Sequence, residues 1–383
     1  MGLILILCAR SWGQLGNLNS ASRLAQKLEA QKLENMQFLV QPIEDCCPLV
    51  AIAGEAMRSV TATSRTPKDR QRRYMEIIDD LNARFPAGFE SDPAFVHDDI
   101  DLLASHIDVF NPDLIIATKG FLSRLAYAAT RRLERTIPIV NFVTNDGLLT
   151  LPIHVTGPEV RNLVQTDFGK QMLKRHPRVS AVGPLVGVPR PVGEIAKSDL
   201  KPLICVLCNN NPEFSAIFDA LIARGDSIGV KTIILGESEM LEQTRIRAPA
   251  HWDVWGAQAA DAYLEILREV SKVARPLLVA KSSPNTVFEG LCGGMPVLAV
   301  RSGLPMEDWV GNLIDESGAG WSADGVATAV SILDRLLDAP GEIAERAKGA
   351  ISFVSRNIDN QATLTRIRDT ICAELDNSAK FRN

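Results

Sequence analysis

Short, nearly continuous aliphatic runs alternate along the chain with longer segments of helical periodicity, and this alternation constrains the fold most. "GLILILCA" is followed by "NSASRLAQKLEAQ" and "MQFLVQPI", and the pattern recurs in "PDLIIATKG", "LSRLAYAATRRLER" and "IPIVNFVTND". Runs of Leu, Ile and Val without polar alternation are typical of parallel strands that helices cover on both faces. The sequence therefore predicts an α/β fold built on doubly wound, Rossmann-like sheets.

The pattern restarts once, which indicates two domains in the 383 residues. The stretch "PRPVGEIAKSDLKP" is rich in Pro and Gly and poor in large apolar residues, as linkers are. After it, "LICVLC", "VKTIILGE" and "PLLVAK" alternate with helical segments, and three further helices end the chain. We predict an N-terminal domain over residues 1–185, a linker over 186–202 and a C-terminal domain with the final helices over 203–383.

The composition narrows the range of partners. The 41 Lys and Arg residues against 46 Asp and Glu leave a net charge of −5, so the chain has no general attraction to nucleic acid. Seven cysteines, an odd number, lie mostly in apolar runs, which indicates a reducing, cytoplasmic setting. Cys205 and Cys208 form a CxxC within a predicted strand, where positions three apart face opposite sides. No second ligand pair has zinc-site spacing, so we expect no metal.

Two segments bear on membranes. "MGLILILCAR" is too short to cross a bilayer, which needs about 20 apolar residues, and we expect a buried first strand there. "RTPKDRQRR", at residues 65–73, lies in a long segment without strands. It is either a solvated helix face or a contact with anionic lipid headgroups, where each basic residue contributes about 1 kcal/mol. Peripheral association of the N-terminal domain with the cytoplasmic face of a membrane is therefore one hypothesis.

The elbow "KSSPNTVFEG", between the strand "PLLVAK" and a helix, is the candidate anion site. Ser283 suits an N-cap, and Pro284 suits the first helical position because it has no N–H to leave unpaired. The backbone N–H groups of Asn285 and Thr286 then point outward at the positive end of the helix dipole. Such an end favours a phosphate.

Two charged residues extend this site. Lys281 ends the strand and adds a positive charge, while Glu289 lies about one and a half turns into the helix, where it can accept hydrogen bonds from a ribose diol. Phosphate and ribose together predict a nucleotide. The alternative is an ordinary capped βα unit, and neither a P-loop nor GxGxxG after a strand is present.

Residues 279–321, "VAKSSPNTVFEGLCGGMPVLAVRSGLPMEDWVGNLIDESGAGW", resemble the donor-site segment of GT-B glycosyltransferases. The resemblance points to the group that contains diacylglycerol glucosyltransferases, monogalactosyldiacylglycerol synthases and the lipid II N-acetylglucosaminyltransferase. The matching positions are Lys281, Glu289, Pro296, Pro305, Glu307 and Asn312. It implies a GT-B architecture of two Rossmann-like domains facing a cleft, with Glu289 holding the donor ribose and with Glu307 and Asp308 in the sugar pocket.

A second stretch, "IPIVNFVTNDGLLTLPIH", resembles the same family, with Asp146 and His154 at its strand-end Asp and downstream His. Asp146 is the first candidate for the base that deprotonates the acceptor, and His154 is the second. The alternatives are a turn residue in "NDG" for Asp146 and a structural histidine for His154.

The chain departs from the family pattern in its loops. "WGQLGNLNS" keeps Gly16 but has Asn17 near the place of a histidine, and the glycine-rich loop after the first C-domain strand is Asn209, Asn210 and Asn211. Asparagine cannot act as a base, yet it adopts left-handed turns and donates amide hydrogens. We therefore predict that Gly16, Asn17, Asn209 and Asn210 contact the nucleotide.

These observations predict a glycosyltransferase that moves a sugar from a nucleoside diphosphate donor, a UDP-sugar, to an acceptor hydroxyl without a metal or bound cofactor. The acceptor is a lipid or another small molecule. Two alternatives stay open: a nucleotide-sugar 2-epimerase, and a non-catalytic partner or regulatory protein with the same fold.

Overall fold

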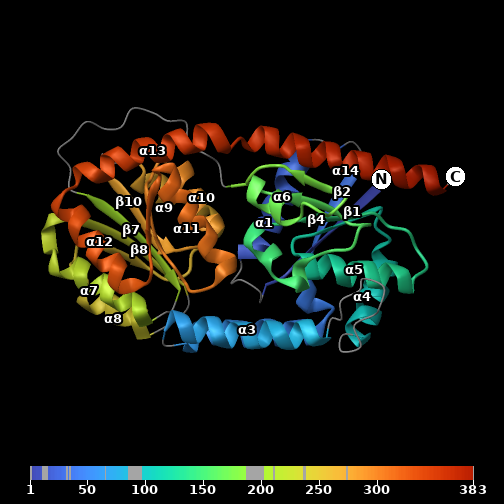
Figure 1. The fold of residues 1–383 in the computed structure, drawn as a ribbon, viewed down its shortest axis with the longest axis horizontal. Helices are drawn as coiled ribbons and strands as arrows, with labels where there is room; N and C mark the ends of the chain where they lie inside the picture. Colours follow the sequence, from blue (N-terminus) through green and yellow to red (C-terminus); the bar gives the residue numbers. More distant parts are fainter. Residues whose placement is uncertain are drawn as a thin grey trace. The chain divides into compact units, whose positions relative to one another are not determined.

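A computed structural model describes residues 2–10, 16–31, 33, 36–64, 66–84, 97–186, 202–209, 212–235, 239–272 and 275–382. They form two compact units: unit 1 comprises Met1–Val60, Arg73–Leu185 and Asp359–Asn383, and unit 2 comprises Thr61–Arg72 and Val186–Ile358. Each unit contains a six-stranded, all-parallel sheet (Figure 1). The predicted α/β class with two doubly wound sheets is confirmed.

Unit 1 has the strand order β2-β1-β3-β4-β5-β6. Its strands are β1 (Gly2–Cys8), β2 (Met36–Pro42), β3 (Leu114–Ala117), β4 (Ile139–Phe142), β5 (Arg161–Val164) and β6 (Val179–Ala181). Its helices are α1 (Gly16–Ala30), α2 (Pro48–Thr63), α3 (Pro67–Arg84), α4 (His97–Phe110), α5 (Gly120–Arg132), α6 (Asp167–Met172) and α14 (Asn360–Arg382), with residues 61–72 at the end of α2 and the start of α3 counted in unit 2.

The central strand β1 is buried on both faces. Ile4 and Ile6 pack in a cluster with Leu24 of α1 and Ile367 of α14. Leu5 points to the opposite face and is only 1% exposed. Because neither face meets water, the strand carries no polar alternation, which is why its sequence is an uninterrupted aliphatic run.

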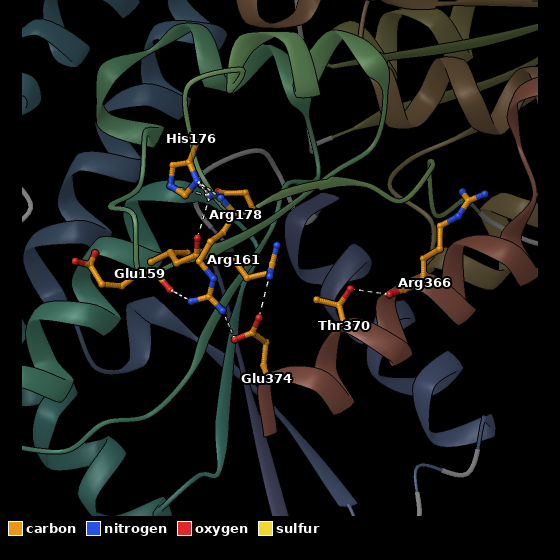
Figure 2. A network of polar contacts seen from close by, with 9 residues as sticks. Glu159, Arg161, His176, Arg178, Arg366, Thr370 and Glu374 are labelled. Carbon is orange, nitrogen blue, oxygen red and sulfur yellow. Dashed lines mark hydrogen bonds and ion pairs between the residues drawn. The ribbon is translucent and has the colours of Figure 1, made fainter. Parts of the chain in front are cut away.

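The C-terminal helix α14 is fastened to unit 1 by polar contacts as well. Glu374 is 5% exposed and forms ion pairs with Arg161 of β5 (Nε to Oε1, 3.2 Å) and with Arg178 (Figure 2). About two helical turns toward the start of α14, Arg366 donates to the carbonyl of Val182 at 3.1 Å. The carboxylate of Glu374 thus holds two arginines at the starts of the neighbouring strands β5 and β6.

Unit 2 has the strand order β12-β11-β10-β7-β8-β9. Its strands are β7 (Leu203–Asn209), β8 (Gly229–Leu235), β9 (Asp253–Trp255), β10 (Pro276–Lys281), β11 (Val297–Val300) and β12 (Gly320–Ala323). Its helices are α7 (Ser215–Ala223), α8 (Glu239–Arg247), α9 (Ala260–Val270), α10 (Pro284–Cys292), α11 (Pro305–Ser317), α12 (Val326–Asp338) and α13 (Gly341–Asn357).

The two faces of β7 show how this sheet is covered. Cys208 packs in the cluster that contains α7 and α12 residues, and Cys205 packs in the cluster formed with α9, α10 and α13. The two thiols therefore lie on opposite faces, as predicted, and burial raises the pKa of Cys205 to about 12. All seven cysteines are free.

The units differ from the predicted domains at two places. Residues 359–383 belong to unit 1 because the apolar side chains of α14, Leu364, Ile367 and Ile371, pack against its sheet. Residues 61–72 belong to unit 2. Most of the predicted linker, 187–201, lies outside the described residues. None of the helices described is long and apolar enough to cross a membrane.

Candidate functional site

The elbow after β10 has the predicted helix start. Ser283 is the N-cap residue, in an extended conformation (φ −126°, ψ 124°), and Pro284 is the first residue of α10. The Ser283 hydroxyl makes no capping hydrogen bond, and the first helical bond runs from Val287 N to Ser283 O at 2.9 Å. The positive end of the α10 dipole therefore lies at the elbow, at the carboxyl edge of a central strand.

A close approach of α10 to the sheet fixes the elbow. A Cβ on Gly290 would lie 2.5 Å from Leu278 Cδ2 of β10, so a larger residue would require the buried Leu278 side chain to shift. Gly294, with φ of +73°, then turns the chain toward β11. The elbow thus belongs to a closely packed unit formed by β10, α10 and β11.

Lys281 and Glu307, which the sequence assigned to phosphate and sugar, form an ion pair with each other. The Nζ–Oε2 distance is 2.5 Å, and the two side chains are 19% and 22% exposed. Buried Ser282 adds a second link, because its hydroxyl donates to the carbonyl of Glu307 at 3.3 Å. The end of β10 and the start of α11 are thereby joined.

Asp308 shapes the loop between β11 and α11. It accepts hydrogen bonds from Ser302 N (2.8 Å) and Gly303 N (3.0 Å), and burial raises the pKa of its carboxyl. Next to it, Arg301 donates to Asn312 Oδ1 at 2.5 Å. Asp308 thus positions the loop, and its contact with a sugar stays a prediction.

Glu289 lies on α10 and is partly buried. Its carboxylate is near enough to Cys292 to help burial raise the pKa of that thiol to about 12. Asn209 ends β7, the strand next to β10, and Asn210 lies outside the described residues. Asn285 and Thr286 are partly buried in the first turn of α10. The nucleotide contacts of these residues stay predictions.

Arg70, near the start of α3, is a site neighbour that the sequence did not single out. It is 3% exposed and donates from Nη1 to Ser302 O at 3.0 Å. Arg72, two residues on, is 63% exposed and pairs with Asp69. The basic run is therefore not uniformly exposed to solvent. Little in the sequence indicated that Arg70 would be buried, beyond its place in a long segment without predicted strands.

In unit 1, Asp146 begins a 3₁₀ turn (Asp146–Thr150) and is fully buried. Its carboxylate accepts from Gln165 N (2.9 Å), Thr166 N (2.7 Å) and Thr166 Oγ1 (2.6 Å). Burial raises its pKa to about 6, and these hydrogen bonds oppose that rise. As placed, the carboxylate holds the start of α6, an arrangement that does not favour its predicted role as a base.

His154 ends a second 3₁₀ turn (Pro152–His154) and is 2% exposed. Its ring meets Phe121 edge-on with centroids 5.7 Å apart, and its buried Nδ1 has no hydrogen-bond partner in the described part of the chain. Burial, followed by the charges of Lys119 and Arg124, holds its pKa well below the ordinary value. The imidazole is therefore neutral at neutral pH, and it accepts a proton less readily than an exposed histidine does.

Asn17 is 5% exposed, and its side chain joins the carboxyl ends of three strands. Its Oδ1 accepts from Ala9 N and from Thr118 Oγ1, both at 2.8 Å, and its Nδ2 donates to Thr144 Oγ1 at 3.3 Å. An amide meets these donors and acceptors together, whereas an imidazole cannot. Asn17 therefore has a structural task at the first turn of α1, which begins at Gly16. Contact of these two residues with a nucleotide stays a prediction.

Comparison with solved structures places this arrangement among known folds. MurG from Acinetobacter baumannii aligns over 97% of this chain and 100% of its own, with a TM-score of 0.57 and 14% identity. UGT89C1 of Arabidopsis thaliana in complex with UDP aligns over the same shares, with a TM-score of 0.61 and 13% identity. The glycosyltransferase VinC in complex with dTDP aligns over 98% and 100%, with a TM-score of 0.55 and 14% identity.

The chain has the GT-B fold. The likeness covers both sheets and nearly the whole chain, at an identity too low to show more than the fold. No protein-family model matches the sequence, and no curated protein matches it. The function must therefore be argued from the site.

Proposed function

We propose that the protein is a glycosyltransferase that binds a nucleoside diphosphate sugar, with UDP as the nucleotide, in unit 2. The observation that carries the proposal is the elbow: α10 starts at the carboxyl edge of a central strand, with Glu289 along the helix and the Lys281–Glu307 pair at the end of that strand. The N–H groups at the start of α10 bind the diphosphate, and Glu289 accepts hydrogen bonds from the ribose diol. UGT89C1 and VinC, which share the fold, were determined with UDP and dTDP.

The chemistry needs charge stabilisation at the leaving diphosphate and a base at the acceptor. A helix N-terminus and fixed donors stabilise the negative charge that grows on the phosphate oxygen, so the proposed mechanism uses no metal. We propose His154 over Asp146 as the base, because the Asp146 carboxylate already accepts three hydrogen bonds, whereas the Nδ1 of His154 is unpartnered among the described residues. A lipid or lipid-linked acceptor fits the resemblance to the diacylglycerol glucosyltransferase group, and a soluble acceptor is the competing class.

Titration calorimetry with UDP, without added metal, tests the donor site. Wild type should bind, and Glu289→Ala should lose about 1.5–3 kcal/mol of binding free energy, the range for hydrogen bonds to a charged group. Glu289→Gln should lose less, because one amide oxygen can still accept. Glu316→Ala, at an exposed glutamate on α11 of the same unit, is the matched control and should bind as wild type does.

The outcomes separate the proposal from its rivals. Absence of UDP binding by wild type would leave the elbow an ordinary helix start and would favour the non-catalytic protein. Binding that Glu289→Ala does not weaken would contradict the ribose assignment. With a UDP-sugar as substrate, release of UDP that needs no acceptor and yields a 2-epimer would point to the epimerase, whereas acceptor-dependent release supports transfer.

A further inference from the structure

Arg70 is buried at the edge of unit 2 although it comes from the basic run of α3. Its guanidinium touches two segments of this unit: Nη1 donates to Ser302 O at 3.0 Å, and Nη2 lies 3.5 Å from Glu213 Oε2. Ser302 lies two residues after the end of β11, and Glu213 lies four residues after the end of β7. Arg70 is separated from its acceptor Ser302 by 232 positions in sequence, and its side chain thus reaches the loops that follow two strands of the sheet.

The strand order places this guanidinium at the elbow. In the order β11-β10-β7, β10 lies between the two strands whose loops Arg70 contacts. Neighbouring strands are about 4.8 Å apart, so a group that reaches both flanking loops lies across the end of β10. β10 ends at Lys281, and the elbow leads from there to the start of α10 at Pro284.

The charge of Arg70 is incompletely matched. Its Nε is buried and has no hydrogen-bond partner among the residues that the structure describes, Ser302 O is neutral, and the contact with Glu213 is long. A buried charge needs a close partner and filled hydrogen bonds to be tolerated. Lys281 is already paired with Glu307. Arg70 is therefore a buried cation with a free donor at the place where an anion is expected.

We propose that Arg70 is a donor-site residue whose guanidinium binds the phosphate groups of the nucleoside diphosphate. The inference rests on the proposed function and adds a residue from the first fifth of the chain to the site. A guanidinium suits this ligand because its planar N–H groups match two phosphate oxygens. During transfer the bond from the acceptor oxygen to the sugar C1 forms, and the bond from C1 to the phosphate oxygen breaks. The acceptor proton goes to the base, the electron pair goes to the phosphate oxygen, and Arg70 stabilises the resulting charge.

Binding of UDP and of uridine, which lacks the phosphates, distinguishes this role from a structural one. Arg70→Gln should weaken UDP binding about ten- to a hundredfold, as expected for lost hydrogen bonds to a charged group, and leave uridine binding within about twofold of wild type. Arg70→Lys keeps the positive charge but not the planar guanidinium. It should weaken UDP binding less than Arg70→Gln does, and it should leave uridine binding unchanged. Arg72→Gln, at the exposed arginine of the same helix, is the matched control and should change neither affinity.

Three results would overturn the inference. One is an Arg70→Gln protein that binds UDP like wild type, and another is equal weakening of UDP and uridine, which indicates a structural role. If Arg70→Gln fails to fold, Arg70→Lys decides, and UDP binding equal to wild type refutes the phosphate contact. Failure of the proposed function is distinct, because wild type would then bind neither UDP nor uridine, and the inference would fall with it.

Discussion

Removal of the Glu374 carboxylate should destabilise unit 1 without touching the candidate donor site. Glu374 has a side chain that is 6% exposed and pairs with Arg161 and Arg178, which are 28% and 31% exposed (Figure 2). Breaking a fully buried ion pair costs about 3–5 kcal/mol, and breaking an exposed pair costs less than about 1 kcal/mol. Because the carboxylate is buried and the arginines are partly solvated, we expect Glu374→Ala to lower the free energy of unfolding by about 2 kcal/mol.

Scanning calorimetry measures this loss as a lower unfolding temperature. For a unit of this size, about 2 kcal/mol corresponds to a decrease of roughly 4–8 °C. Glu374→Gln retains one acceptor and should lose about half as much. Glu345→Ala, which removes a pair whose side chains are 71% and 72% exposed, is the control and should change the temperature by less than about 1–2 °C. Equal effects of Glu374→Ala and Glu345→Ala would refute the claim that the ion pairs of Glu374 with Arg161 and Arg178 hold α14 to unit 1.

Two further changes test the interior of unit 1. The folded-state pKa of Asp146, about 6, lies above its ordinary 3.8, so its carboxyl stabilises the fold at low pH and this contribution is lost as the pH rises through 6. The free energy of unfolding of wild type relative to Asp146→Asn should therefore fall by about 2–3 kcal/mol between pH 4 and pH 6 in urea titrations, and a constant difference would contradict the assigned burial. Gly120→Ala should cost at least about 2 kcal/mol, because its Cβ would lie 1.9 Å from the carbonyl oxygen of His154. Gly341→Ala, where a Cβ meets nothing within 4 Å, is its control. Equal urea midpoints for the Gly120→Ala and Gly341→Ala proteins would contradict the predicted clash.

The fold could be predicted because the parallel strands are buried on both faces. Ile4 and Leu5 face opposite sides of β1 and are both inaccessible to water, which leaves an uninterrupted aliphatic run in the sequence. The place of α14 could not be predicted in the same way. Its apolar positions, such as Ile367, indicate that one face is covered, but a helical pattern does not say which sheet covers it.

At the candidate site, the start of the helix could be predicted from the local sequence. Ser283 and Pro284 start a helix through local backbone preferences, and the structure has α10 beginning there. Asp146 depends on Gln165 and Thr166, nearly twenty residues away, and local sequence does not reveal that its carboxylate is already occupied. The approach of Arg70 to Ser302 spans most of the chain and follows from the tertiary structure alone.

A crystal structure of the protein with UDP tests the central claim most directly. The account predicts the diphosphate at the start of α10, at residues 284–286, with the ribose hydroxyls within hydrogen-bonding distance of the Glu289 carboxylate. UDP bound elsewhere, or a ribose that turns away from Glu289, would contradict it.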